Sequence, residues 1–316
     1  MKNRKTSLWQ RLLITSLLAV SFQAGAQCLP EPVMPTAEDM PAMLEKAVDR
    51  GFLWKISKDG QSSWLYGTIH ANRREALVPG PQTRAALLGS DAVAVELDIT
   101  DAATMGEVMQ LAKQAVVPIP APYDARLKAQ LKQRCLPAEL TDQMHASLIF
   151  SALMMVDARQ DGIEAGFGTE IFLLGAAQGA KKKIIALETP AEQMQAILDD
   201  GKTTAKQYQQ ALKLLESGKA RQQMNKLVDA WNRSDFSVLE RYSQWCECME
   251  TAEDRAMMKR VIDDRNELIA QRIARNHRVD QAVFIGVGSL HMVGKKGLPN
   301  LLRQQGFTVE RVTFAP

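Results

Sequence analysis

The sequence lacks a hydrophobic run long enough to cross a membrane. Its most apolar run, residues 12–22, is 11 residues long, whereas a membrane-spanning helix needs about 20. Low-complexity tracts and fixed-period repeats are also missing, which argues against a disordered chain and a repeat protein. The 316 residues are 46% hydrophobic and 24% charged, a composition typical of a globular protein with one large domain or two small ones.

Several catalytic signatures are missing as well. The chain has no His-Glu-x-x-His pair, no Gly-x-x-x-x-Gly-Lys-Ser/Thr loop and no Gly-x-Ser-x-Gly elbow. These absences argue against a zincin, a P-loop NTPase and a serine hydrolase of that type. The pair Gly286 and Gly288 lacks the third glycine and the helix start of a dinucleotide-binding loop, so no such cofactor is indicated.

Acidic residues are missing from the first 26 positions, although the whole chain has 39 basic and 36 acidic residues. This segment carries four basic residues, then the apolar run, then Ala24-Gly25-Ala26. That order is typical of a secretory signal peptide, so we expect residues 1–26 to be removed and the mature protein to be periplasmic or secreted. A lipid anchor on Cys28 is disfavoured because Gln27 does not suit a lipobox.

Export changes how the charge and the cysteines are interpreted. Removing the four basic residues leaves 35 basic against 36 acidic residues, a net charge of about −1, which gives no support to nucleic-acid binding. The four cysteines, Cys28, Cys135, Cys246 and Cys248, all remain after cleavage. In an oxidising compartment they predict up to two disulfides, with three pairings open. A metal site on Cys246 and Cys248 is less favoured because their spacing is not the usual two-residue gap.

Alternating apolar runs predict the fold class. Residues 52–56 and 63–70 flank a turn that contains Asp59 and Gly60, which predicts a β-hairpin. Further strands are predicted at 92–97, 183–188, 282–288 and 307–313, and helices at 82–88, 101–117, 124–134, 141–160, 169–178 and 298–305. Apolar strands separated by helices favour an α/β fold with a mostly parallel central sheet flanked by helices.

We expect a single domain over residues 50–316, preceded by a Pro-rich leader at 27–49. Residues 203–276 have a helical pattern almost throughout, with breaks near Gly218 and Ser234. Because this stretch interrupts the alternation of strands and helices, we expect it to form a helical insertion or cap.

Polar residues at the ends of the predicted strands indicate a site. His70, Glu96 and Glu188 end strands, and His291 follows the last core strand. Ligands of open parallel sheets bind beside these strand ends, although a single polar residue there can simply cap the sheet. The two histidines share a Gly-x-x-His form and are two of only four in the chain. Two imidazoles and a carboxylate suit a divalent transition metal, so we predict a metal site from His70, His291 and Glu96.

Taken in order, these segments resemble the TraB/GumN family, whose animal relatives include the Tiki metalloproteases. The resemblance covers roughly residues 50–312, and its matching stretches are 65–70, 94–98, 168–170, 185–189, 264–266, 286–294 and 297–299. Tiki proteins are manganese- or cobalt-dependent proteases. The resemblance therefore implies a metal-dependent peptidase with manganese or cobalt as the cofactor, and zinc is a further candidate for the predicted site.

The resemblance also implies roles for individual residues. The helix-opening acid of the family falls on Glu170, where Asp is more usual, and its Arg-Asn helix pair falls on Arg265 and Asn266. Glu170 would act as a further metal ligand or as a general base, while Arg265 would stabilise the developing oxyanion. A structural ion pair of Arg265 with Glu96 or Glu170 is an equally open interpretation. Glu188 is expected to support packing or to hold the metal ligands in place.

We therefore predict a metal-dependent hydrolase, most simply a peptidase that acts on a secreted or periplasmic peptide or protein. The alternative is a non-enzymatic module of the cell envelope that binds a peptide or a partner in the same crevice. We expect no nucleic-acid partner and no membrane anchor after cleavage of the signal peptide. The substrate, the physiological metal and the oligomeric state stay open.

Overall fold

The central sheet has six strands in the order β4-β3-β5-β2-β1-β6. A computed structural model describes residues 28–198, 203–278 and 280–314, so the predicted signal peptide lies outside the described residues. The strands are β1 (Phe52–Lys58), β2 (Gln61–Thr68), β3 (Ala92–Val95), β4 (Lys183–Ala186), β5 (Val283–Gly288) and β6 (Thr308–Arg311). The first four in this order run parallel, whereas β1 is antiparallel to both of its neighbours.

The predicted hairpin is confirmed. Asp59 and Gly60 both have positive φ, of 51° and 80°, and they join β1 to β2 in a register that pairs Lys58 with Gln61. Two consecutive left-handed residues form the turn that matches the twist of paired strands. The hairpin therefore fixes where β2 begins, and with it the position of the residues that follow β2.

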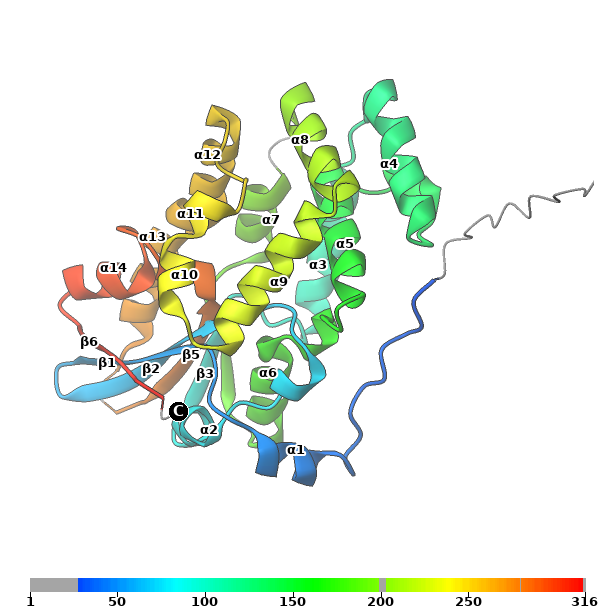
Figure 1. The fold of residues 1–316 in the computed structure, drawn as a ribbon. Helices are drawn as coiled ribbons and strands as arrows, with labels where there is room; N and C mark the ends of the chain where they lie inside the picture. Colours follow the sequence, from blue (N-terminus) through cyan, green and yellow to red (C-terminus); the bar gives the residue numbers. More distant parts are fainter. Residues whose placement is uncertain (1–27, 199–202, 279, 315–316) are drawn as a thin grey trace, which may run out of the picture.

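Helices cover the sheet and extend away from it (Figure 1). Those before residue 200 are α1 (Met40–Lys46), α2 (Pro81–Leu88), α3 (Ala102–Gln114), α4 (Ala121–Gln133), α5 (Ala146–Arg159), α6 (Thr169–Gly179) and α7 (Pro190–Leu198). Those after it are α8 (Ala205–Glu216), α9 (Lys219–Asn232), α10 (Phe236–Glu240), α11 (Tyr242–Trp245), α12 (Ala252–Met258), α13 (Asp264–Asn276) and α14 (Leu298–Gln304). Among the described residues, none of these helices is long and apolar enough to traverse a bilayer.

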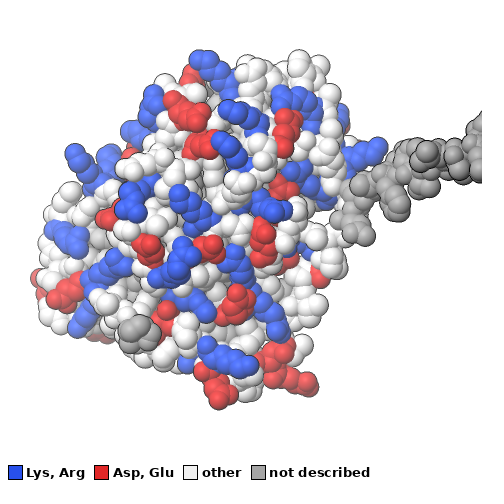
Figure 2. Space-filling model, in the orientation of Figure 1, with Lys and Arg blue, Asp and Glu red and all other residues white. Residues whose placement is uncertain are grey.

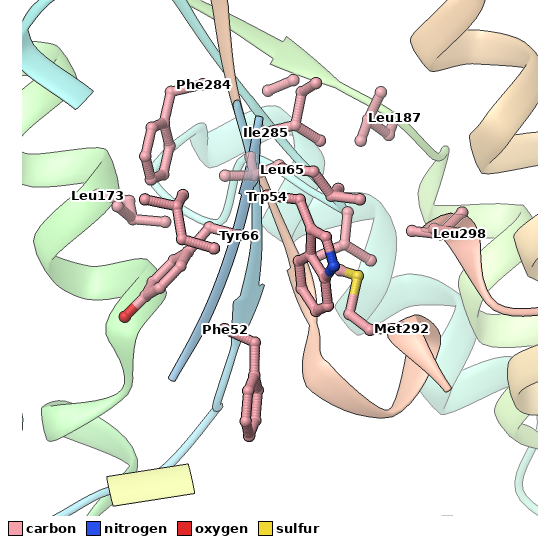
Figure 3. Packing of buried hydrophobic residues seen from close by; sticks show 14 of the residues in the cluster. Phe52, Trp54, Leu65, Tyr66, Leu173, Leu187, Phe284, Ile285, Met292 and Leu298 are labelled. Atoms are coloured by element: carbon pink, nitrogen blue, oxygen red, sulfur yellow. The ribbon is translucent and has the colours of Figure 1, made fainter. Parts of the chain in front are cut away.

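The main core lies against the sheet. Its strands are apolar on both faces at the centre, where all six residues of β5 are buried, as expected for a strand covered by helices on each side. Figure 3 shows Trp54, Tyr66 and Phe284 packed with side chains from the surrounding helices and loops, including Leu173, Leu187, Met292 and Leu298. The mostly parallel α/β fold class is confirmed.

A second apolar core is made by helices alone. Its buried residues come from α4, α5, α8 and α9 and are Leu127, Leu131, Ile149, Leu153, Leu212, Leu215 and Ala220. In Figure 1, α4, α5 and α8 lie at the upper right, and α9 runs from them toward the sheet. Helix α13, by contrast, packs Ile269, Ala270 and Ile273 into the main core. Residues 203–276 are therefore divided between the two cores.

Three local predictions need correction. The helix expected over 141–160 begins only after His145, whose Nδ1 accepts the backbone N–H of Ser147 as a helix cap. The strands expected to end at 70, 97 and 188 end at 68, 95 and 186. The Pro-rich leader also contains helix α1, because Pro41 stands in its first turn, where the missing N–H costs no hydrogen bond.

Trp231 connects the helical part to the sheet. It is 1% exposed on α9, and its indole N–H donates to the carbonyl of Gly67 on β2 at 2.8 Å. Its ring also lies against Gly51, where a methyl group would stand 2.5 Å from the ring. The strand that leads into His70 is thus held by a residue of α9.

We predict that Trp231→Ala lowers the free energy of unfolding by about 3–5 kcal/mol, because it leaves a large cavity. Trp231→Phe, the matched control, keeps most of the ring but leaves the buried Gly67 carbonyl without its donor, at a cost of about 1–3 kcal/mol. Urea unfolding followed by circular dichroism measures both. A loss below about 1 kcal/mol for the alanine variant, which is typical of surface positions, contradicts this role.

Candidate functional site

The carboxyl ends of four parallel strands bring the predicted residues to one edge of the sheet. His70 follows β2, Glu96 follows β3 and Glu188 follows β4, each within two residues of the strand end. His291 lies on the short 3-10 helix Ser289–Met292 directly after β5. Because β5 lies between β2 and β3, the two histidines and Glu96 come from three adjacent strands.

These three side chains surround the α-carbon of Gly288. A methyl group placed there would stand 3.3 Å from Oε1 of Glu96, 3.4 Å from Nε2 of His70 and 3.5 Å from Cδ2 of His291. The N–H of Gly288 donates to the same Glu96 oxygen at 2.8 Å. Glycine therefore leaves the space in which the two rings and the carboxylate approach one another.

Glu170 holds the ring of His70. Its Oε1 lies 2.9 Å from Nδ1 of His70 and accepts the hydroxyl of Thr68. The negative charge of Glu170 raises the pKa of His70, although the histidine side chain is 70% exposed. Burial acts to raise the pKa of Glu170, but the His70 ring and the hydrogen bonds outweigh it and lower that pKa. The pair therefore favours a charged carboxylate and a protonated, positively charged His70 ring, with its Nδ1–H directed at Glu170.

His291, in contrast to His70, is held in its neutral form. It is 3% exposed, and burial lowers its pKa to about 4. Its Nδ1 lies 2.7 Å from Oδ1 of Asn266, whose amide nitrogen donates to the carbonyls of His291 and Lys296. Because Oδ1 only accepts, His291 carries its proton on Nδ1, and Nε2 is left as a bare acceptor.

Arg265 occupies the centre of the site. Its guanidinium donates to Glu188 at 2.8 Å and to Glu96 at 2.5 Å, and one of its nitrogens lies 3.4 Å from Nε2 of His291. Burial acts to raise the pKa of Glu96, but the two histidines and Arg265 outweigh it and lower that pKa to about 2. The sequence left open an ion pair of Arg265 with Glu96 or with Glu170. The structure contains the pair with Glu96 and a second, unpredicted pair with Glu188.

Two members of the network were not predicted. Thr68, which bonds Glu170, lies two residues before His70 in the first Gly-x-x-His segment, so its position was the available signal. Gln193 on α7 donates to Glu96 at 3.2 Å, and no sequence pattern distinguished it from other helix residues. The predicted residues His70, Glu96, Glu170, Arg265 and His291 all belong to the same cluster.

The donor chemistry suits a divalent metal, although the ligands are not arranged as a preformed site. Among residues 28–198, 203–278 and 280–314, no three side chains of His, Cys, Asp or Glu are grouped to hold an ion. Each site histidine nevertheless has its Nδ1 bound by an oxygen, so that Nε2 is the ring nitrogen open to a metal. This arrangement is typical of metal-binding histidines. The Nε2 of His291 has an Arg265 nitrogen at 3.4 Å, which a metal would displace.

A cleft of about 410 Å³ opens beside the cluster. The polar side chains His70, Glu96, Glu170 and Gln193 line one part of it. The rest is apolar and includes Val95, Leu97, Ile99 and Ile171, of which Ile99 and Ile171 are 42% and 40% exposed. Exposed large apolar side chains next to convergent polar groups are typical of a ligand site.

A sequence model described as the TraB/PrgY/gumN family matches residues 52–311. The chain belongs to the TraB/PrgY/gumN family. The predicted resemblance is confirmed, and the match includes all six strands and every member of the cluster. Neither a curated protein nor a solved structure matches the chain, so family membership is what the comparisons establish.

We predict that Arg265→Met destabilises this family member strongly, because Glu96 and Glu188 are then buried without a counter-charge. The expected loss in the free energy of unfolding is about 3–5 kcal/mol. Arg275→Met, on an exposed arginine of the same helix α13, is the control and is expected to cost less than about 0.5 kcal/mol. Equal losses for the two variants in urea unfolding contradict the central role of Arg265.

A pH-dependent pair holds β4 and α7 against α13. Arg272 bonds both oxygens of Glu192 at 2.7 Å and also donates to the carbonyl of Leu187. The Arg272 hydrogen bonds lower the pKa of Glu192 to about 2. Because this folded-state pKa lies below the unfolded value, the pair stabilises the protein above about pH 4.5 and loses its effect as the pH falls toward 2.

Glu192→Gln is therefore expected to cost about 0.5–1 kcal/mol at pH 7, a modest value because a third of the side chain is exposed. The difference from the unmodified protein should disappear near pH 2. Glu107→Gln, at an exposed position of α3, serves as the control. Urea unfolding at several pH values measures both variants, and a cost for Glu192→Gln that does not depend on pH contradicts the prediction.

Proposed function

We propose that the chain is an exported, divalent-metal-dependent hydrolase that acts on peptides. The observation that carries this proposal is the arrangement around Gly288, where His70, His291 and Glu96 converge. The Nδ1 of each histidine is already bound by Glu170 or Asn266. Nε2 is therefore the nitrogen of each ring that would bind the metal, as in metal centres whose ligands are held by outer partners.

In this proposal His70, His291 and Glu96 hold the metal, which could be manganese, cobalt or zinc. When bound, the metal would polarise a carbonyl group as a Lewis acid. Outer partners such as Glu170 and Asn266 orient the rings and fix the proton on Nδ1. The buried His291 stays neutral at pH 7 because its pKa is about 4, and a neutral ring is the form that binds metal. Glu170 raises the pKa of His70 to about 9, so metal binding would release the Nε2 proton of His70.

Two further roles, proton transfer and the stabilisation of negative charge, are assigned to Glu170 and Arg265. Glu170 has a lowered pKa and is therefore ionised at neutral pH, so it can accept a proton or serve as a further ligand. Arg265 places one nitrogen 3.4 Å from His291, where a positive charge would stabilise negative charge on a substrate oxygen. Its bonds to Glu96 and Glu188 keep the guanidinium in place for that role.

The cleft supports a peptide as the substrate. It joins the charged cluster to an apolar wall that includes the exposed Ile99 and Ile171. The amide groups of a peptide can bind the charged cluster, and its side chains can pack against the apolar wall. The mixture of basic and acidic residues on the face in Figure 2 offers no single-sign surface for a polyanion.

Export is supported by the sequence and by the cysteines. Residues 1–26 have the order of a signal peptide. The four cysteines form two disulfides, Cys28–Cys135 and Cys246–Cys248, which persist in oxidising compartments. We therefore place the mature protein in the periplasm or outside the cell.

Metal binding is tested by calorimetry on the chelator-treated chain with Mn²⁺, Co²⁺ and Zn²⁺. We expect one site, and its loss in the double variant His70→Ala, His291→Ala. Asn266→Ala should weaken binding by about 10–100-fold, because it removes an outer partner. His277→Ala, which changes a histidine outside the cluster, is the control. No binding, or binding unchanged by the double variant, overturns the metal assignment.

Hydrolysis is tested with a quenched-fluorescence peptide library and the metal that binds. Cleavage that requires both His70 and His291 supports the hydrolase. The second candidate, a binding module without turnover, is favoured by one observation, which is that Arg265 already neutralises Glu96 and Glu188. Peptide binding to the metal-loaded chain without cleavage would establish that module and reject the enzyme.

A further inference from the structure

The disulfide between Cys246 and Cys248 differs from Cys28–Cys135 in the length of chain that it closes into a loop. It joins residues two positions apart, between α11 and α12, whereas Cys28–Cys135 spans 107 positions. A cross-link stabilises a fold mainly by closing a loop of the unfolded chain, and the effect grows with the length of that loop. The Cys246–Cys248 bond therefore contributes little to holding the fold together.

The residue between these cysteines is in an unfavourable conformation. Glu247 has a φ of 49°, in the left-handed region that is costly for residues with a side chain. Its carboxylate bonds Lys219 at 2.7 and 2.9 Å, and its carbonyl accepts Gln210 at 3.2 Å. The closed ring thus holds Glu247 in a geometry that an open chain is free to leave.

The two sulfur atoms are not equivalent. Cys246 is 1% exposed, whereas Cys248 is partly exposed. The backbone N–H of Cys248 lies 3.1 Å from Sγ of Cys246 and donates to it. A donor at this position stabilises a thiolate on Cys246, which makes that sulfur the better leaving group.

A small cavity of about 170 Å³ lies beside Trp245 and Glu247, the two chain neighbours of Cys246. It is lined by Lys219, Gln222, Gln223, Lys226, Trp245 and Glu247. The ammonium group of Lys226 lies 4.5 Å over the ring of Trp245, and that of Lys219 bonds Glu247. Positive charge next to a disulfide favours the approach of an attacking thiolate.

We propose that Cys246–Cys248 is a thiol–disulfide exchange site whose reaction partner is a dithiol. One thiolate of the partner attacks Sγ of Cys248, so that a mixed disulfide forms and Cys246 leaves as a thiolate. The second thiolate of the partner then attacks its own bridging sulfur and releases Cys248. The partner leaves as a disulfide, and two electrons and two protons have passed to the two cysteines. This activity does not depend on the cluster around Gly288.

The first test compares the two disulfides within the unmodified folded chain. The protein is equilibrated with graded ratios of reduced to oxidised dithiothreitol, alkylated and analysed by peptide mass spectrometry. Cys246 and Cys248 should be half reduced at a ratio at least tenfold lower than Cys28 and Cys135, which corresponds to about 30 mV. Reduction of both disulfides at the same ratio overturns the proposal.

The second test uses a matched pair of variants, Cys246→Ser and Cys248→Ser, each of which breaks the same bond and leaves one thiol. Glutathione disulfide is added, and the mixed disulfide is measured by intact mass, with folding checked by circular dichroism. The exposed Cys248 of the first variant should react at least about tenfold faster than the buried Cys246 of the second, because exchange requires access to the sulfur. Equal rates, or faster reaction of Cys246, overturn the assignment.

Discussion

The guanidinium of Arg265 is the interaction on which the carboxyl edge of the sheet depends. Glu96 and Glu188 follow neighbouring strands, are 8% and 4% exposed, and bond the same arginine nitrogen. Two buried carboxylates this close would not both stay ionised without a cation. Asn266, the next residue of α13, fixes His291. One turn of α13 therefore sets both the charge balance of the site and the orientation of its buried ring.

The ion pair between Arg265 and Glu96 also affects how a divalent metal can bind. The negative charge of Glu96 is already shared between Arg265, Gln193 and the N–H of Gly288. A divalent cation that binds Glu96 thus enters a site with a resident positive charge, and it must share or displace one of these donors. The proposed hydrolase requires this exchange, since Glu96 is one of the residues that would hold its metal. Metal-dependent catalysis at this cluster therefore requires Glu96 to replace one of these three hydrogen-bond donors by the metal.

The sequence predicted the fold and most of the cluster because these features follow from local patterns. The apolar runs around Ala94 and Ile285 are long enough to identify parallel strands, and parallel strand ends meet at one edge. The contacts of Arg265 with Glu188 and of Gln193 with Glu96 depend on how α13 and α7 pack against the sheet. Such packing is set by distant side chains rather than by spacing along the chain. The cap at His145 was missed because histidine is not a usual cap residue.

The position of β5 has a consequence for the order in which the molecule is assembled. It lies between β2 and β3, so the middle of the sheet is supplied by residues 283–288, which follow β2 and β3 by a long stretch of chain. Before those residues emerge, β2 and β3 have a gap between them, and His70 and Glu96 have no Gly288 to meet. Pairings this distant in sequence form slowly. A chain that emerges from its N-terminus would thus carry an unassembled site until β5 has emerged.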